Sequence, residues 1–109
     1  MTASLPTEGA IVQAWQRAAQ RALAADLPHQ LRQRGASVLV PSKSADGVTY
    51  HVQLVAGRVG QCDCPAALNG REACAHRAAV ALRLLERQSG VRVTGVKSAD
   101  AVLPFVWAA

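Results

Sequence analysis

The sequence predicts an α+β fold, because two stretches with helical spacing enclose a stretch with strand alternation. Apolar residues recur at steps of three and four over residues 8–25 and again over 74–88. Between them, residues 48–55 alternate between apolar and polar side chains, as a half-buried strand does. The expected order is N-terminal helices, a small antiparallel β-sheet, a further helix and a short C-terminal extension, in a single domain over residues 1–109.

The N-terminal helical segment, residues 7–35, is expected to contain two helices. Thr7 is a candidate N-cap for the first, whose apolar stripe is Ile11, Trp15, Ala18, Ala22 and Ala25. The second is expected to begin after Asp26 and to end at Gly35, because glycine commonly follows the last residue of a helix. His29 lies near the start of this second helix and is expected to face solvent.

Residues 37–89 are expected to form β-hairpins followed by a helix. A short strand over 37–41 and the alternating strand over 48–55 are separated by a turn that ends in Asp46-Gly47, a strong hairpin signal. Ala56-Gly57 makes a second turn, after which a third strand runs from residue 58 into Cys62.

The last helix is predicted from Cys74 to Gln88, with Gly90 just past its C-terminus. Its expected apolar stripe consists of Ala78, Ala81, Leu82 and Leu85. In the C-terminal segment, residues 90–109, the stretches 91–96 and 101–107 are both expected to be extended.

Composition and charge narrow the classes of function. Twelve Lys and Arg against seven Asp and Glu give a net charge of +5, which suits nucleic acid, an acidic protein or an anionic surface. The sequence has no apolar run long enough to span a bilayer and no signal-peptide pattern, so a cytoplasmic protein without a membrane partner is expected. Only 4% of the residues are aromatic, so the core is expected to be thin and a metal would help to stabilise it.

The cysteines indicate a metal site. Cys62 and Cys64 are followed after nine residues by Cys74, and His76 comes two positions later. Three thiolates and one imidazole make a complete tetrahedral set for zinc, with no position left for water. Soft thiolate ligands select zinc over magnesium or calcium. The pattern predicts one structural Zn²⁺ held by Cys62, Cys64, Cys74 and His76.

The residues around the ligands favour this interpretation. Pro65 biases Cys64 toward an extended backbone, Asn69-Gly70 offers a turn, and N–H groups at the following helix start can stabilise a thiolate. Three other interpretations are a Cys-x-Cys redox pair, a Cys/His nucleophile pair and three buried structural cysteines. The close spacing of the cysteines and the adjacent histidine favour the metal.

The pattern Cys62-x-Cys64-Pro65, then Gly70-x-x-x-Cys74-x-His76, resembles the SWIM-type zinc finger. Tyr50-x-Val52 before it and Ala78, Ala79 and Leu82 after it agree with that family, so the resemblance covers about residues 48–85. It implies a zinc-bound ββα-like finger, in which a β-hairpin delivers the first two cysteines and a helix follows the Cys-x-His pair. It also implies a role in DNA binding or in protein–protein interaction.

Five arginines are candidates for a phosphate-binding surface around the metal: Arg58, Arg71, Arg77, Arg83 and Arg87. The last three lie on the side of the final helix away from its apolar stripe. The alternative is an ordinary solvated helix face, interrupted by Glu86. His51 is expected on the polar face of its strand, and Asp63, between two ligands, either orients one of them or is a turn or surface residue.

The function expected from these observations is a non-enzymatic zinc-binding module that binds nucleic acid, with DNA as the favoured partner. No catalytic motif accompanies the cysteines, and no small-molecule substrate is expected. The alternative is a protein–protein interaction adaptor with a purely structural zinc site, anchored by Trp15 or by the apolar tail Leu103–Trp107.

Overall fold

The computed structural model describes residues 8–42, 47–65, 73–95 and 101–106, and it confirms the α+β class. The elements are α1 (Glu8–Ala24), η1 (Leu27–His29), β1 (Arg32–Arg34), β2 (Ser37–Pro41), β3 (Thr49–Val55), β4 (Arg58–Cys62), α3 (Ala75–Ser89) and η3 (Leu103–Phe105), where η denotes a 3₁₀ turn. The four strands form one antiparallel sheet in the order β1-β2-β3-β4. Within the described ranges, no helix has the length and apolar character needed to cross a membrane.

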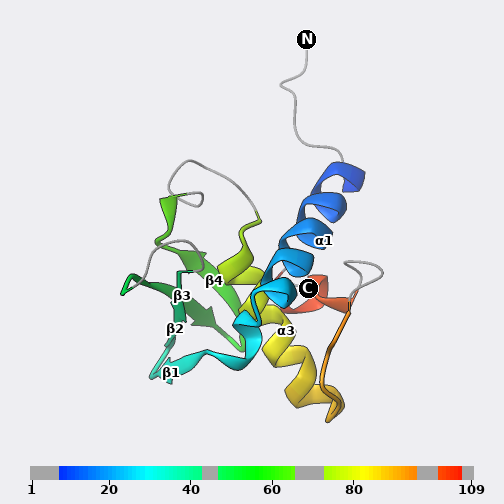
Figure 1. Cartoon of the computed structure of the whole chain (residues 1–109). Helices are drawn as coiled ribbons and strands as arrows, with labels where there is room; N and C mark the ends of the chain where they lie inside the picture. The colour runs from blue at the N-terminus through cyan, green and yellow to red at the C-terminus, as the bar shows by residue number, and fades with distance from the viewer. Residues whose placement is uncertain (1–7, 43–46, 66–72, 96–100, 107–109) are drawn as a thin grey trace.

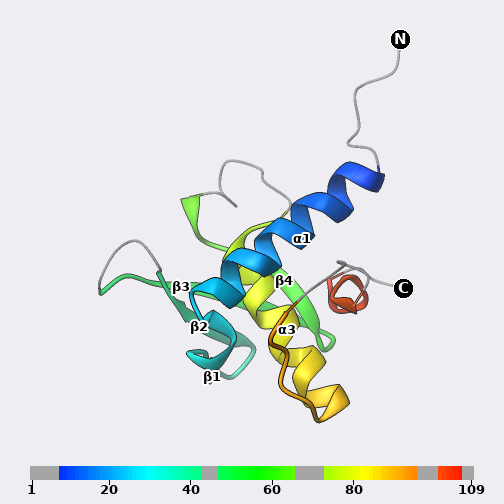
Figure 2. The ribbon, with the colours of Figure 1, turned by 45° about the vertical axis from the view of Figure 1, so that its right-hand side comes forward.

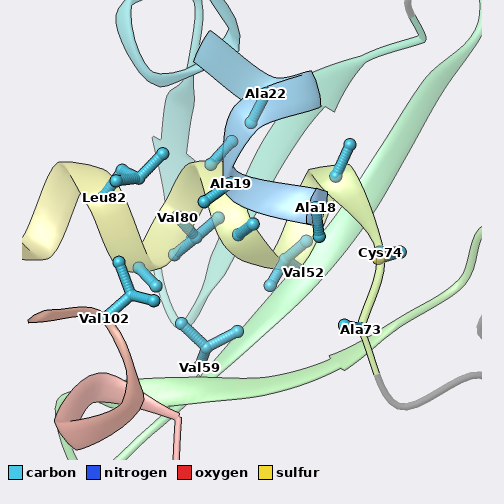
Figure 3. Packing of buried hydrophobic residues seen from close by; sticks show 14 of the residues in the cluster. Ala18, Ala19, Ala22, Val52, Val59, Ala73, Cys74, Val80, Leu82 and Val102 are labelled. Carbon is cyan, nitrogen blue, oxygen red and sulfur yellow. The ribbon is translucent and has the colours of Figure 1, made fainter. Parts of the chain in front are cut away.

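Helix α3 is the centre of the packing. It contacts α1, η1, β3, β4 and η3, and it lies between α1 and the sheet (Figures 1 and 2). Residues 78–82 are therefore buried on every side of the helix, where only one apolar stripe was expected. Figure 3 shows Ala18, Ala19 and Ala22 of α1 on one side of α3, with Val52 and Val59 of the sheet beyond it. Alanine at the crossing lets the two helices approach closely.

The first helix follows its predicted stripe. Trp15, Ala18 and Ala22 are fully buried, and Ile11 is half-buried at the N-terminal end. Trp15 is the largest fully buried side chain among the described residues, in a core where most of the other side chains are alanine and valine, with a few leucines and the three cysteines. The predicted N-cap, Thr7, lies outside the described residues.

The second predicted helix, after Asp26, is wrong. Asp26 has φ 53°, a left-handed conformation that turns the chain off the helical path, and only the 3₁₀ turn η1 follows. The chain then forms the edge strand β1, whose Arg34 pairs with Ser37 of β2. Gly35, with φ 61°, belongs to the loop of this hairpin instead of ending a helix. Glycine is favoured at positive φ both after the last residue of a helix and in a hairpin loop, so Gly35 alone could not distinguish the two.

The two predicted hairpins are present. Strands β2 and β3 pair in a register that sets Val38 opposite Val52, and both side chains are buried against α3. On the other face of β3, His51 is exposed, as expected. Strands β3 and β4 are joined by the two-residue turn Ala56-Gly57, and Asp46 of the first turn lies outside the described residues.

The second of the two C-terminal segments predicted to be extended contains a 3₁₀ turn instead. Residues 91–95 form no strand, and η3 follows with Pro104 in its first turn, where the missing proline N–H costs nothing. Val102, Leu103 and Val106 are buried, and η3 contacts α3 and β4. Residues 96–100 and Trp107 lie outside the described residues. The apolar residues that suggested a strand thus cap the core.

The Ala56-Gly57 turn predicts a stabilising substitution. Both residues have positive φ, 53° and 77°, as a type I′ turn requires, and a non-glycine residue with a Cβ pays about 1 kcal/mol there. Asparagine tolerates this conformation, so Ala56→Asn should raise the free energy of unfolding by up to about 1 kcal/mol. Urea denaturation measures this effect, and Gly57→Ala, with the opposite change, should destabilise the protein. An Ala56→Asn midpoint at or below wild type would contradict the assigned turn.

His29, expected in solvent, instead pairs with a buried carboxylate. Its Nε2 lies 3.0 Å from both carboxylate oxygens of Glu86, which is 7% exposed, and its Nδ1 lies 2.6 Å from Oδ1 of Asp26. The Val93 N–H donates to Glu86 Oε2 at 2.9 Å. This cluster ties η1 and the chain after α3 to the last turns of α3.

The cluster predicts a pH optimum of stability. Hydrogen bonds to Glu86 and then Asp26 raise the pKa of His29 above 6.5, although Arg92 opposes them. Burial raises the pKa of Glu86, but the hydrogen bonds from His29 and Val93, with Arg83 nearby, bring it below 4.5. The contribution of His29 to the free energy of unfolding is complete below pH 6.5 and is lost as the pH rises through its raised pKa. The contribution of Glu86 is complete above pH 4.5 and is lost as the pH falls through its lowered pKa.

The stabilisation from this cluster should therefore be greatest between pH 4.5 and 6.5. The measurement is the difference in free energy of unfolding between wild type and His29→Gln, followed from pH 4.5 to 9. Groups that titrate in the same way in both proteins contribute equally and drop out of this difference. The difference should shrink as pH rises above 6.5. A difference that is independent of pH would contradict the ion pair.

Candidate metal centre

A β-bulge in β4 directs Cys62 into the molecule. Val59 pairs with Leu54 and Cys62 with Val52, so two residues of β4, Gly60 and Gln61, oppose a single residue of β3. In a regular strand, Val59 and Cys62 would point to opposite faces; the extra residue places both on the buried face. Glycine suits position 60 because a Cβ there would lie 3.0 Å from the Gln53 carbonyl oxygen and 3.1 Å from Val55 Cγ2, closer than ordinary van der Waals contact.

The other two cysteines come from the segment after β4 and from the start of α3. Cys64 is 1% exposed and precedes Pro65, beyond the end of the strand. Cys74 is the N-cap of α3: its backbone is extended, and its Sγ accepts the Arg77 N–H at 3.4 Å. A thiolate at this position satisfies a free N–H of the first turn and faces the positive end of the helix dipole.

His76 completes the group from the first turn of α3. Its ring packs against Tyr50 of β3, with centroids 4.7 Å apart and ring planes at 49°. Its Nδ1 is buried and has no hydrogen-bond partner among the described residues. A buried ring nitrogen without a partner is costly, and coordination of a metal by this ring would account for its position.

The four predicted ligands form one compact group. One ligand atom from each of Cys62, Cys64, Cys74 and His76 lies within 4.8 Å of all the others. Sulfur atoms bound to tetrahedral zinc at about 2.3 Å would be about 3.8 Å apart, so a contraction of about 1 Å closes the group around one ion. The donor set, its burial and the unpartnered His76 nitrogen all fit a zinc ion with no position open to water.

The thiols are electrostatically prepared to bind a cation. The hydrogen bond with Cys62 lowers the pKa of Cys74 to about 4 against the effect of burial, with His76 and the Arg77 N–H adding to the shift. The same interaction and burial raise the pKa of Cys62, because a second negative charge beside the Cys74 thiolate is unfavourable. A divalent cation bound between Cys62 and Cys74 would offset this repulsion.

Asp63 contacts the neighbouring strand. Its Oδ1 accepts the His51 N–H at 2.8 Å, its Oδ2 lies 3.1 Å from His51 Nδ1, and its own N–H donates to the His51 carbonyl at 3.3 Å. These bonds join the Cys62–Cys64 segment to β3. Asp63 is thus a half-exposed residue that bonds to His51 of β3, and none of these hydrogen bonds reaches a metal ligand.

The candidate phosphate-binding arginines do not share one surface. Arg83 lies 3.8 Å from Glu86, and Arg87 donates to Gln33 of β1 at 3.3 Å, both in the last turns of α3, whereas the metal ligands are at its start. Arg58 begins β4 and is half-buried. Arg71 lies outside the described residues.

Arg77 serves the interior of the protein. Its Nε donates to the carbonyl of Gly60 at 2.7 Å, and its guanidinium lies 5.1 Å from the centre of the Trp15 ring. One side chain thus joins the β4 bulge, α1 and the start of α3, close to the ligands on both elements. Helical spacing placed Arg77 opposite the apolar stripe but could not show that α1 covers that side.

The sequence signal for the bulge in β4 was Gly60, a glycine inside a predicted strand.

In comparisons with known proteins, no family model, no curated protein and no solved structure matches the chain. The assignment of the site therefore depends on its own chemistry and geometry. A Cys₃His group is positioned to bind a metal ion, and the molecule is an α+β protein built around it.

Proposed function

We propose that the protein is a cytoplasmic, non-enzymatic zinc-binding module of the SWIM type that binds DNA. The observation that carries the proposal is the group of four ligand atoms within 4.8 Å, gathered from β4, the segment after it and the start of α3. This order matches the hairpin, cysteine pair and helix of that family. Four protein ligands leave no coordination site for a substrate, so zinc stabilises the fold.

The case for DNA depends on charge. The net charge of +5 favours a polyanion, and arginine provides the forked donors that suit phosphate oxygens. The adaptor alternative loses one of its two anchors, because Trp15 is fully buried and unavailable to a partner. The other anchor ends at Trp107, outside the described residues, while Leu103 and Val106 are buried in the core.

The test of the proposed function measures zinc content and DNA binding on the same preparation. Wild-type protein should carry one zinc per chain and bind a mixed-sequence duplex in fluorescence anisotropy at low salt, where electrostatic contacts are strongest. Affinity should fall steeply with added salt. Zinc-loaded protein that fails to bind duplex DNA at low salt would refute the DNA-binding role and leave the metal site intact.

A further inference from the structure

The outer face of the sheet, directed away from α3, collects the arginines of the strands. Pairing aligns Arg32 with Leu39 and His51, and aligns Arg34 with Ser37 and Gln53. Because paired residues share a face, Arg32 and Arg34 lie on the same side as exposed His51 and Gln53. Arg58 pairs with Val55, which is 59% exposed, and so belongs to this face as well.

This face carries more positive than negative charge, and the Asp63 carboxylate that lies beside it pairs with His51. Strands β1 to β4 contain three arginines and no aspartate or glutamate. Within the described part of the chain, the side chains of Arg32, Arg34 and Arg58 form no ion pair. By contrast, Arg83 pairs with Glu86, and Arg92 lies 3.7 Å from Asp26. The sheet therefore has three guanidinium groups without an ion-pair partner among the described residues, whereas on α3 Arg83 is paired with Glu86 and Arg87 bonds to the neutral Gln33.

Spacing also suits a nucleic-acid backbone, and Arg32 and Arg34 are exposed while Arg58 is half-buried. Arg32 and Arg34 are two residues apart on one strand, about 6.6 Å, close to twice the 3.4 Å axial spacing of charges along one DNA strand. Arg58 lies on β4, at the opposite edge of the sheet from β1. Helices α1 and α3 both lie on the other side of the sheet (Figures 1 and 2).

We propose that this outer sheet face, through Arg32, Arg34 and Arg58, is the surface that binds the phosphate backbone of duplex DNA. The proposal rests on the proposed function and specifies its surface. None of the described aromatic side chains points outward here: Trp15 is buried, Tyr50 packs against His76, and Phe105 belongs to η3. Stacking of unpaired bases therefore has no platform, and contact with the backbone of a duplex is favoured.

The experiment compares duplex binding by wild type, the triple variant Arg32→Gln/Arg34→Gln/Arg58→Gln, and two matched double variants. Arg83→Gln/Arg87→Gln removes the α3 arginines, and Arg17→Gln/Arg21→Gln removes two exposed arginines of α1. Three lost phosphate contacts should lower the slope of log affinity against log salt by about 2.7 and weaken binding roughly 100-fold near 0.1 M salt. The double variants should keep slopes within about 0.5 of wild type.

Each outcome has a distinct meaning. If only the triple variant shows a shallower slope of log affinity against log salt, with zinc content and melting temperature unchanged, the sheet face is the binding surface. If the α3 variant loses it instead, or all variants lose slope in proportion to the charge removed, the assignment of the surface is wrong while DNA binding stands. If wild type does not bind, the proposed function fails with it. A single-stranded oligonucleotide bound more tightly than the duplex would also overturn the duplex assignment.

Discussion

Removal of zinc is expected to unfold the protein. Zinc binding contributes about 10–16 kcal/mol to small zinc modules, whereas domains of this size are stable by only about 5–15 kcal/mol in total. Without the metal, the thiols of Cys62, Cys64 and Cys74 would be buried together, and the junction of β4 with α3 would lose the ion that bridges it. Because α3 contacts both α1 and the sheet, its loss should take the rest of the core with it.

The measurement is far-UV circular dichroism with a thermal melt, before and after treatment with excess EDTA at neutral pH. The treated protein should lack a cooperative transition, and added zinc should restore it. EDTA presaturated with zinc is the matched control and should have no effect. An unchanged melting temperature after verified removal of zinc would show that the metal does not stabilise this fold.

Trp15→Ala is expected to be the most damaging single substitution in the apolar core. Trp15 is 0% exposed, and truncation of a buried tryptophan costs about 3–5 kcal/mol through lost burial and the cavity left behind. The loss is large here because neighbouring Ala18, Ala19 and Ala22 cannot fill the space. Arg77 would also lose the ring over which its guanidinium lies. Urea unfolding followed by circular dichroism measures the effect.

Trp15→Phe is the matched control, because it keeps an aromatic ring beneath Arg77. Trp15 Nε1 is buried without a hydrogen-bond partner among the described residues, and phenylalanine removes this unsatisfied group. The stability lost because the ring is smaller should be partly offset by the removal of the unsatisfied N–H. Trp15→Phe should therefore lower the free energy of unfolding by about 1–2 kcal/mol. Equal losses in the two variants would mean that ring volume and the Arg77 contact contribute little.

Helices and strands were predictable where the residue spacing and the residues at both ends indicated the same element. The spacing over 74–88, Cys74 at the helix start and Gly90 beyond its end located α3 to within a residue or two, because periodicity and both ends agreed. By contrast, residues 26–35 offered a cap, a proline and a glycine that suit a helix as well as a hairpin. The left-handed conformation of Asp26 decided between them, and sequence spacing does not reveal it.

The donor set of the metal centre was also predictable, because the spacing of three cysteines and a histidine already specifies a tetrahedral group. Its supports were not predictable. The Gly60 bulge, the Arg77 bond to its carbonyl and the tilted ring contact between Tyr50 and His76 join residues that are distant in sequence. The same reason explains why the predicted arginine surface on α3 did not form. Helical spacing predicts that Arg77, Arg83 and Arg87 lie opposite the apolar stripe, but in the folded protein each contacts a different neighbour.

X-ray absorption spectroscopy at the zinc edge identifies the atoms bound to the metal. We expect one zinc per chain, with three sulfur atoms at about 2.3 Å and one nitrogen at about 2.0–2.1 Å. In Cys74→Ser, zinc should be lost or the sulfur count should fall to two. Purified wild-type protein without zinc, or with a first shell dominated by oxygen, would contradict the assignment of Cys62, Cys64, Cys74 and His76 as a metal centre.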